Sequence, residues 1–391
     1  MALYRESQKE NMYKKLLFLI KKNPHYLPFL GLNYFREKID FKFFSGLGFS
    51  IFPSLITILV TKRCNFNCLG CSSNSPSYTK NFNEKKEIGL EEIKKIIDEV
   101  AWFRPFIYLN GGEPTLRKDL IEIIKYVKEK RLVCALTTNA SLLNKDLAVE
   151  LVKNRLDFLS VSIDGPEEFH DRMRGVRGAY KKAVGGVKEL SEYKKQNKTN
   201  YPHIRLASII FPNQVENARH IIDLANSLEV DEIGFGLLMY YPENILREQR
   251  KFISKYDTGG CEPIGLEIKN NQKFNFSENK YLDFLNYARN KSKIPIYFAY
   301  KGKQFTEYFD TEIFPNQKSK CFTPWNSLLI QPNGDLGICQ GFVFGNAFKG
   351  NILKQWNNKK IRNFRKLRAK TPFPACFRCN EGQKLILNNT L

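Results

Sequence analysis

The sequence predicts an α/β fold in which a parallel sheet is covered by helices on its outside. Between residues 55 and 239, short apolar stretches typical of strands alternate with longer stretches of helical periodicity. Strands and helices that alternate at this spacing form parallel sheets. Polar residues follow several of the predicted strands, and the carboxyl ends of parallel strands meet at one edge, so these residues are expected to gather there.

The individual elements follow from local composition. The strand candidates are short, apolar and rich in β-branched and aromatic residues: 55–60, 106–110, 133–137, 158–163, 203–211 and 232–238. The helix candidates between them are amphipathic: 90–100, 119–130, 147–153, 179–194 and 215–228. Nearer the carboxyl end, residues 330–339 predict a hairpin, because the pair Asn333-Gly334 tolerates the positive φ values of a tight turn.

The 391 residues suit a core of about 200 residues with additions. We expect a basic, aromatic amino-terminal extension (1–53), the core (54–240), a bridging region (241–314) and a small cysteine-containing domain (315–391). The extension interleaves lysines with aromatic residues, as in 13–22 and 41–49. Such a segment either contacts a membrane surface or forms a helical extension packed on the core or on a second subunit, and we favour the packed extension.

The chain carries 62 Lys and Arg against 40 Asp and Glu, a net charge of +22, which favours an anionic partner such as lipid headgroups, RNA or a phosphorylated substrate. No apolar run approaches the roughly eighteen residues of a spanning helix, and residues 1–10 do not resemble a secretory signal. Seven of the nine cysteines fall into two ligand-like groups, which favours a reducing compartment. We expect a cytoplasmic protein, with peripheral membrane contact as an option, and no DNA partner.

The first cysteine group, Cys64, Cys68 and Cys71, directly follows the first predicted strand with C-x3-C-x2-C spacing. Three thiolates on a short loop can hold three irons of a four-iron cluster and leave the fourth iron open to a ligand. The alternatives are half of a zinc site or three unrelated buried thiols. Zinc sites usually combine C-x2-C with a second pair, so this spacing favours the cluster.

This triplet resembles the signature of the radical S-adenosylmethionine (SAM) superfamily. Downstream, Gly111-Gly112-Glu113-Pro114 ends the next predicted strand and is similar to the family's GGEP motif. Two glycines let the backbone approach a ligand closely, and Glu113 supplies an acceptor for the methionine ammonium group. The resemblance implies a partial (β/α)6 barrel whose chemistry lies at the carboxyl ends of the strands.

The resemblance also implies that later strand ends contact the sugar and the methionine carboxylate of SAM. The candidates are Thr138, Asn139, Ser162 and Asp164, although Asn, Asp and Ser are also common cap residues. Arg174 resembles the family's arginine that pairs with the same carboxylate. Many members carry an aromatic residue against the adenine just before the third cysteine. Gly70 stands there in this chain, so the adenine contact must come from elsewhere, for example from Phe66.

The second cysteine group resembles the auxiliary-cluster extension called the SPASM/Twitch domain and consists of Cys321, Cys339, Cys376 and Cys379. Full SPASM domains have more cysteines, so these four support one auxiliary [4Fe-4S] cluster, fully ligated, as an electron relay or a structural staple. A zinc ion held by the same thiolates is the rival interpretation. Cys134 lies in a predicted strand and is expected to be buried and inert. Cys261 is expected to be more exposed, unless it too is simply buried.

Together the resemblances imply a [4Fe-4S] cluster whose open iron is chelated by SAM. An electron from an external donor of the flavodoxin or ferredoxin type would split SAM into methionine and a 5′-deoxyadenosyl radical, which abstracts hydrogen from an unactivated C–H bond.

Our first substrate hypothesis is a lipid or isoprenoid chain, with carbon–carbon bond formation. It rests on the basic aromatic extension, the 31 phenylalanines and an expected position of Met239-Tyr240-Tyr241 at the substrate opening, although these tyrosines could also be ordinary packing under a loop. The alternatives are peptide or protein maturation, RNA modification, and a non-catalytic metal-binding scaffold.

Overall fold

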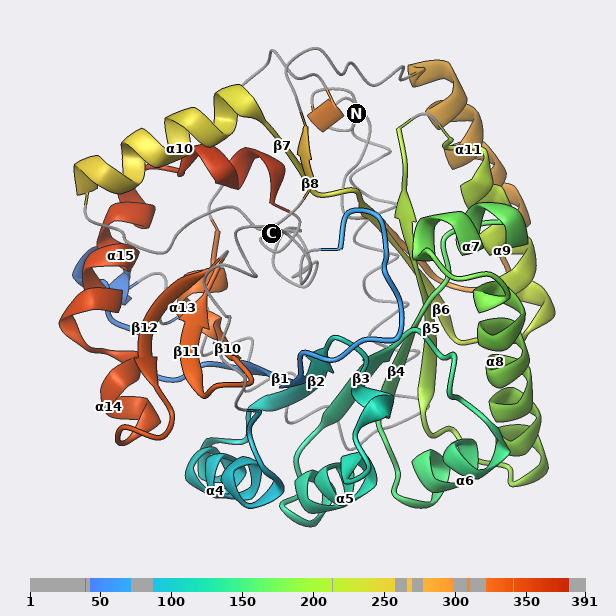
Figure 1. The fold of residues 1–391 in the computed structure, drawn as a ribbon, viewed down its shortest axis with the longest axis horizontal. Helices are drawn as coiled ribbons and strands as arrows, with labels where there is room; N and C mark the ends of the chain where they lie inside the picture. The colour runs from blue at the N-terminus through green and yellow to red at the C-terminus, as the bar shows by residue number, and fades with distance from the viewer. Residues whose placement is uncertain are drawn as a thin grey trace.

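The computed structural model in Figure 1 describes residues 39, 43–71, 87–212, 214–256, 266–268, 277–298, 308–309, 321–339 and 341–379. Most of the predicted amino-terminal extension, namely residues 1–38 and 40–42, and Cys261 lie outside this set.

A curved ten-stranded sheet forms the centre of the molecule, with the strand order β12-β11-β10-β1-β2-β3-β4-β5-β6-β9. Within this order, the seven strands β1-β2-β3-β4-β5-β6-β9 all pair in parallel with their neighbours. They are β1 (Leu55–Thr61), β2 (Phe106–Gly111), β3 (Cys134–Thr138), β4 (Phe158–Ser162), β5 (His203–Ile210), β6 (Glu232–Leu237) and β9 (Ile296–Phe298). The six strands that the sequence predicted are confirmed, each to within about one residue at either end.

Three strands from the carboxyl-terminal region extend the same sheet beyond β1: β10 (Ser327–Ile330), β11 (Asp335–Ile338) and β12 (Phe342–Asn346). β10 pairs in parallel with β1, and it forms an antiparallel hairpin with β11 around Asn333-Gly334, where Gly334 has a φ of 83°. The predicted hairpin is therefore confirmed. Because β10 covers the free edge of β1, Cys339, which directly follows β11, is carried by the same sheet as the first cysteine group.

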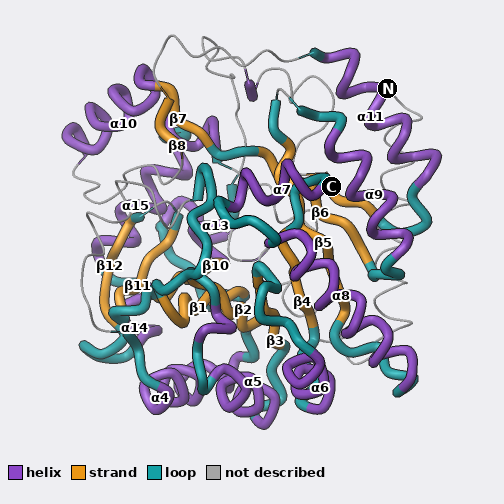
Figure 2. The backbone as a smooth tube through the Cα atoms, turned by 45° about the vertical axis from the view of Figure 1, so that its right-hand side comes forward, coloured by secondary structure: helices purple, strands orange, loops and turns teal. Residues whose placement is uncertain are grey.

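Helices surround the outside of the curved sheet, as Figures 1 and 2 show from two directions. The five predicted helices are confirmed: α4 (Leu90–Val100), α5 (Leu120–Glu129), α6 (Lys145–Lys153), α8 (Ala179–Gln196) and α9 (Asn217–Ser227). Further helices and one small sheet were not predicted: α7 (Glu167–Arg174), α10 (Glu243–Tyr256), α11 (Glu278–Lys291), α13 (Thr323–Asn326), α14 (Ile352–Trp356), α15 (Lys359–Lys370), and the pair β7 (Tyr240–Pro242) and β8 (Leu266–Ile268). None of the described helices has the length and hydrophobicity to span a membrane.

The main hydrophobic core lies between the outer face of the sheet and the helices. Ile56, Ile58 and Val60 of β1 are fully buried, and Ile93 and Ile97 of α4 belong to the same cluster. Burial of a side chain of this size contributes about 2 kcal/mol. The apolar residues thus occupy the outer face, which leaves the inner face of the sheet for a different set of side chains.

Tyr240 and Tyr241 are fully buried in β7, so the prediction that they face the substrate opening is wrong. The Tyr240 hydroxyl donates to the backbone oxygen of Tyr308 (2.7 Å), and its ring stacks on Phe309 with centroids 5.9 Å apart. The guanidinium of Arg378 lies over the Tyr240 ring at 5.5 Å. Tyr240 therefore joins β7 to Arg378, which lies between Cys376 and Cys379.

Candidate active site

The loop that carries the first cysteine group is anchored at two places among its described residues. At its start, the Thr61 hydroxyl and the Lys62 amide donate to Glu87 Oε1 (2.6 and 3.0 Å). Farther along, the amides of Asn67 and Leu69 donate to the carbonyl oxygens of Arg174 (3.3 Å) and Met173 (2.8 Å), at the carboxyl-terminal end of α7. The last carbonyls of a helix have no partner within the helix, and here they accept hydrogen bonds from the loop amides. These bonds fix the cysteine loop against α7.

The thiols of this loop lie close enough to affect one another. Burial raises the pKa of Cys64 and the backbone amide of Phe66 opposes it, while the negative charges of Glu113 and Cys71 raise it further. Burial also raises the pKa of Cys68, and the positive charge of Arg174 acts in the opposite direction. Soft thiolate ligands on one short, anchored loop fit the donor set of an iron–sulfur cluster.

The glycines of the GGEP motif make close backbone contacts that the sequence did not predict. A Cβ on Gly111, whose φ is 150°, would lie 2.4 Å from the Thr61 backbone oxygen, and one on Gly112 would lie 2.2 Å from that of Arg63. The amides of Gly112 and Glu113 donate to these same two oxygens (2.8 Å each). The close approach that requires glycine is therefore made to the cysteine loop, which lies directly against the end of β2.

Glu113 is buried (1% exposed) and joins three segments. Its Oε1 accepts hydrogen bonds from the Thr115 amide (3.1 Å), the Thr115 hydroxyl (2.6 Å) and the Thr138 hydroxyl (2.6 Å), and its Oε2 accepts one from the Asn139 amide (2.7 Å). Asn139 in turn donates through Nδ2 to Asn65 Oδ1 in the cysteine loop (2.9 Å). Asn65 was not among the predicted site residues, although it lies inside the cysteine motif.

We expect Glu113→Ala to destabilise the fold by about 3 kcal/mol, because it leaves the buried Thr138 hydroxyl and Asn139 amide without their acceptor. Urea unfolding followed by circular dichroism measures this change. Glu91→Ala is the matched control: Glu91 pairs with Lys94 on an exposed helix surface, where a change within about 0.5 kcal/mol is expected. Equal unfolding midpoints for the two variants would contradict a central role of Glu113.

Arg174 and Asp164 form a buried ion pair, with Nη2 and Oδ2 2.8 Å apart and side chains 16% and 4% exposed. Asp164 Oδ1 accepts from the Ile209 amide (3.0 Å), and the Asp164 amide donates to His170 Nδ1 (3.2 Å). Arg174 Nε is buried and has no hydrogen-bond partner among the described residues. An orphaned guanidinium N–H fits a carboxylate ligand such as that of SAM, because Arg can bind a carboxylate through two N–H groups.

Two other candidates are less connected. Ser162 is half-buried at the end of β4, where it pairs with Ala207 of β5, and its hydroxyl has no hydrogen bond within the described part of the chain. Phe66, offered above as an adenine contact, is buried (7% exposed). The structure therefore brings Glu113, Thr138 and Asn139 together beside residues 63–65 of the cysteine loop, and Asp164 and Arg174 together beside residues 67–68.

In the second cysteine group, Cys321, Cys339 and Cys376 surround Arg368 of α15. Burial would lower the pKa of this arginine, but the charges of the three thiolates raise it. No group of three His, Cys, Asp or Glu side chains in the described ranges is placed to hold a metal ion directly. Ligands of a cluster lie farther apart than ligands of one ion, because iron and sulfide stand between them. Cys134 is fully buried in β3, as predicted.

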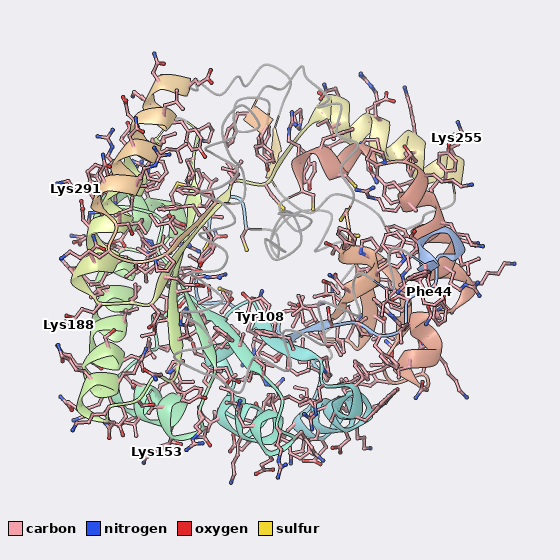
Figure 3. All side chains as sticks on the ribbon, turned by 180° about the vertical axis from the view of Figure 1, so that it is seen from behind. Phe44, Tyr108, Lys153, Lys188, Lys255 and Lys291 are labelled. Carbon is pink, nitrogen blue, oxygen red and sulfur yellow. The ribbon has the colours of Figure 1, made fainter. Side chains whose placement is uncertain are left out.

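Polar side chains form a row across the inner face of the sheet. Strand pairing aligns Thr137, Ser160, Arg205 and Glu232 on four neighbouring strands. Arg205 forms an ion pair with Glu232, and the Tyr108 hydroxyl forms a hydrogen bond with the Thr137 hydroxyl. Figure 3 shows Tyr108 on the inner side of the sheet and Lys153, Lys188 and Lys291 on the outer helices. The inner face thus carries a row of polar side chains at this level of the sheet, whereas the outer face is apolar there.

Two family models match the chain. Residues 58–225 match the radical SAM superfamily, and residues 321–380 match the iron–sulfur cluster-binding domain SPASM. The first match contains Cys64, Cys68 and Cys71, and the second spans Cys321 to Cys379. A match to an iron–sulfur cluster-binding domain supports a cluster at the second group in place of the rival zinc ion.

The chain spans less than half the length of the first curated relatives that it matches. The Fe-coproporphyrin III synthase of Methanosarcina barkeri is 32% identical over 182 residues, which are 46% of this chain and 43% of that protein. The PqqA peptide cyclase of Bradyrhizobium diazoefficiens is 28% identical over 191 residues, 48% of this chain and 47% of that protein.

The fold is also similar to solved structures. SuiB of Streptococcus suis bound to S-adenosylmethionine superposes with a TM-score of 0.58 at 16% sequence identity, covering 81% of this chain and 68% of that one. Its complex with the precursor peptide SuiA gives a TM-score of 0.57 at 15% identity, covering 87% and 74%. The two matched domains imply a [4Fe-4S] cluster, SAM and an auxiliary cluster. The chain therefore contains a radical SAM domain and a carboxyl-terminal SPASM domain.

Proposed function

We propose that this enzyme abstracts hydrogen from an unactivated C–H bond of a peptide or protein. When bound, the cluster and SAM together supply a 5′-deoxyadenosyl radical for this step. In this proposal Cys64, Cys68 and Cys71 hold the cluster, and Cys321, Cys339, Cys376 and Cys379 hold the auxiliary one. The electron donor is expected to be of the flavodoxin or ferredoxin type.

The chain's own residues would bind and orient SAM. The orphaned Nε of Arg174 is a donor for the methionine carboxylate. Glu113 Oε2 accepts only one described hydrogen bond, so it keeps a lone pair for the methionine ammonium group. Both residues are held by several contacts, and such rigidity supports a precise orientation of the bond to be broken.

The single observation that carries the substrate class is the polar row on the inner face of the sheet. Tyr108, Thr137 and Arg205 are partly exposed and carry hydrogen-bonding groups and a charge, which suit a peptide group better than a hydrocarbon chain. The lipid hypothesis has lost its support from Tyr240 and Tyr241, which are buried. The names of two similar proteins, PqqA peptide cyclase and SuiB with its precursor peptide, also favour a peptide.

Untargeted mass spectrometry tests this proposal in cells that express the wild type or Cys64→Ala. The variant is the matched control, because it keeps the protein surface but loses a cluster ligand. We expect a peptide whose mass changes only with the wild type, for example by the loss of two hydrogens. A lipid or RNA product that depends on Cys64 would overturn the peptide assignment.

An iron porphyrin is a second candidate substrate. The Arg205 side chain is 40% exposed on the inner face, where its guanidinium could pair with a porphyrin carboxylate. The Fe-coproporphyrin III synthase relative points in the same direction. A porphyrin absorption band that shifts when the purified protein is added would favour this candidate. An unchanged band would leave the peptide as the proposed substrate.

A further inference from the structure

The sulfur of Cys68 has a charged partner from outside the cysteine loop. Arg174 Nη1 donates a hydrogen bond to Cys68 Sγ at 3.8 Å. This distance is long for oxygen but is suitable for the larger sulfur atom. The two residues are 106 positions apart in the sequence, and α7 brings the arginine to the loop.

The guanidinium of Arg174 is held in this position from several sides. Nη2 pairs with Asp164 Oδ2 at 2.8 Å, while Asp164 Oδ1 is itself bound to the Ile209 amide of β5. The Arg174 backbone oxygen accepts the Asn67 amide of the cysteine loop. At Gly175, whose φ is 68°, a Cβ would lie 2.6 Å from the Asn67 oxygen, so the loop and the end of α7 are in direct contact. Little freedom remains for the arginine to move away from the sulfur.

A fixed positive charge beside a cluster ligand changes the energy of the cluster's redox states. Reduction adds a negative charge, which a nearby guanidinium stabilises, and hydrogen bonds to the ligand sulfurs are among the main factors that set the potential. The side chains of Arg174 and Asp164 are largely buried, so water screens this interaction weakly.

We propose that Arg174 sets the reduction potential of the cluster held by Cys64, Cys68 and Cys71, and makes this cluster easier to reduce. This inference rests on the assignment of those three cysteines as the cluster ligands. It gives Arg174 a task beyond binding the SAM carboxylate: it acts on the cluster through Cys68 even when SAM is absent. Asp164 has an opposing effect, because its carboxylate partly neutralises the arginine.

The test is an anaerobic redox titration of the reconstituted full chain without SAM, followed by electron paramagnetic resonance. The proteins compared are the wild type, Arg174→Met, Arg174→Lys and Asp164→Asn. Cys64→Ala supplies the spectrum of the auxiliary cluster alone, which is subtracted from the others. Iron and sulfide contents are measured for every sample.

We expect Arg174→Met to shift the midpoint potential of the first cluster to a more negative value, because both the charge and the hydrogen bond are lost. Arg174→Lys keeps the charge without the planar donor group and should show a smaller shift. Asp164→Asn should shift the potential in the positive direction. The auxiliary cluster should keep its potential in all three variants.

Opposite shifts from the two partners of one ion pair separate a redox role from a structural one, since a loosened loop would lower the cluster content in both. A fully loaded Arg174→Met with the wild-type potential would overturn the inference. If Arg174→Met does not assemble the first cluster, unchanged potentials in both Arg174→Lys and Asp164→Asn would overturn the inference. A wild type without the first cluster would instead refute the ligand assignment, which is a separate outcome.

Discussion

We expect Cys64→Ala to reduce the formation of 5′-deoxyadenosine from SAM to background while the fold stays intact. Three thiolates bind three irons of a four-iron cluster and leave the fourth iron open to SAM. Without one of them a second iron has no protein ligand, which prevents a stable cluster of this kind. The Cys64 residue is exposed, and its sulfur accepts only one described hydrogen bond, from the Phe66 amide at 3.4 Å. Its replacement should therefore change the free energy of unfolding by less than about 0.5 kcal/mol.

Cys134→Ala is the matched control, because it removes a buried cysteine that belongs to neither of the two cysteine groups. Cys134 is fully buried in β3, and burial raises the pKa of its thiol, so it is an inert core residue. This variant should keep SAM cleavage and lose about 1 kcal/mol of stability through the small cavity. Product chromatography, iron content and thermal unfolding measure the three quantities. Wild-type yields of 5′-deoxyadenosine from Cys64→Ala would refute the role of the first cysteine group.

The core strands could be predicted because each carries its own signal. β1 to β6 are short apolar segments with the helices between them, and their order in the sheet follows the order in the sequence. The hairpin at Asn333-Gly334 had an equally local signal. By contrast, β10 joins β1 across a separation of more than 250 residues, and nothing in Ser327–Ile330 specifies that partner.

Short elements in the bridging region also lacked a clear pattern. β9 has three residues, and its position beside β6 depends on packing. Tyr240 and Tyr241 were expected at the substrate opening because they follow the last predicted strand of the core. The burial of Tyr240 comes from Tyr308, Phe309 and Arg378, which are far away in the sequence.

At the site, the motifs located the residues but not their mutual contacts. Gly111 and Gly112 were expected to face a ligand, whereas the structure gives them backbone partners at Thr61 and Arg63. Arg174 could be expected near SAM from resemblance alone. Its bond to Cys68 depends on the docking of the cysteine loop onto α7, a tertiary contact that no local pattern encodes.

His170 should make the stability of the protein depend on pH between about 6.5 and 4. It is fully buried on α7, and burial, together with the charge of Arg174, lowers its pKa from 6.5 to about 4. The unfolded chain therefore binds a proton in this range that the folded protein excludes. The stabilisation is fully present above pH 6.5 and is lost as the pH falls toward 4, by about 3 kcal/mol in total.

His170→Asn separates this contribution from the others. The asparagine side-chain oxygen can still accept a hydrogen bond from the Asp164 amide, which in the wild type donates to His170 Nδ1, but asparagine takes up no proton.

Other groups contribute to the pH dependence as well. Carboxylates with lowered pKa, such as Asp119, act in the same direction but mainly below their ordinary pKa of about 4. His220 is half-buried with a lowered pKa, so His220→Asn measures its share. Urea unfolding at pH 7 and pH 4.5 should show a clearly smaller loss of stability in His170→Asn than in the wild type. Equal losses would mean that the pKa of His170 is not lowered in the folded protein, and would contradict this prediction.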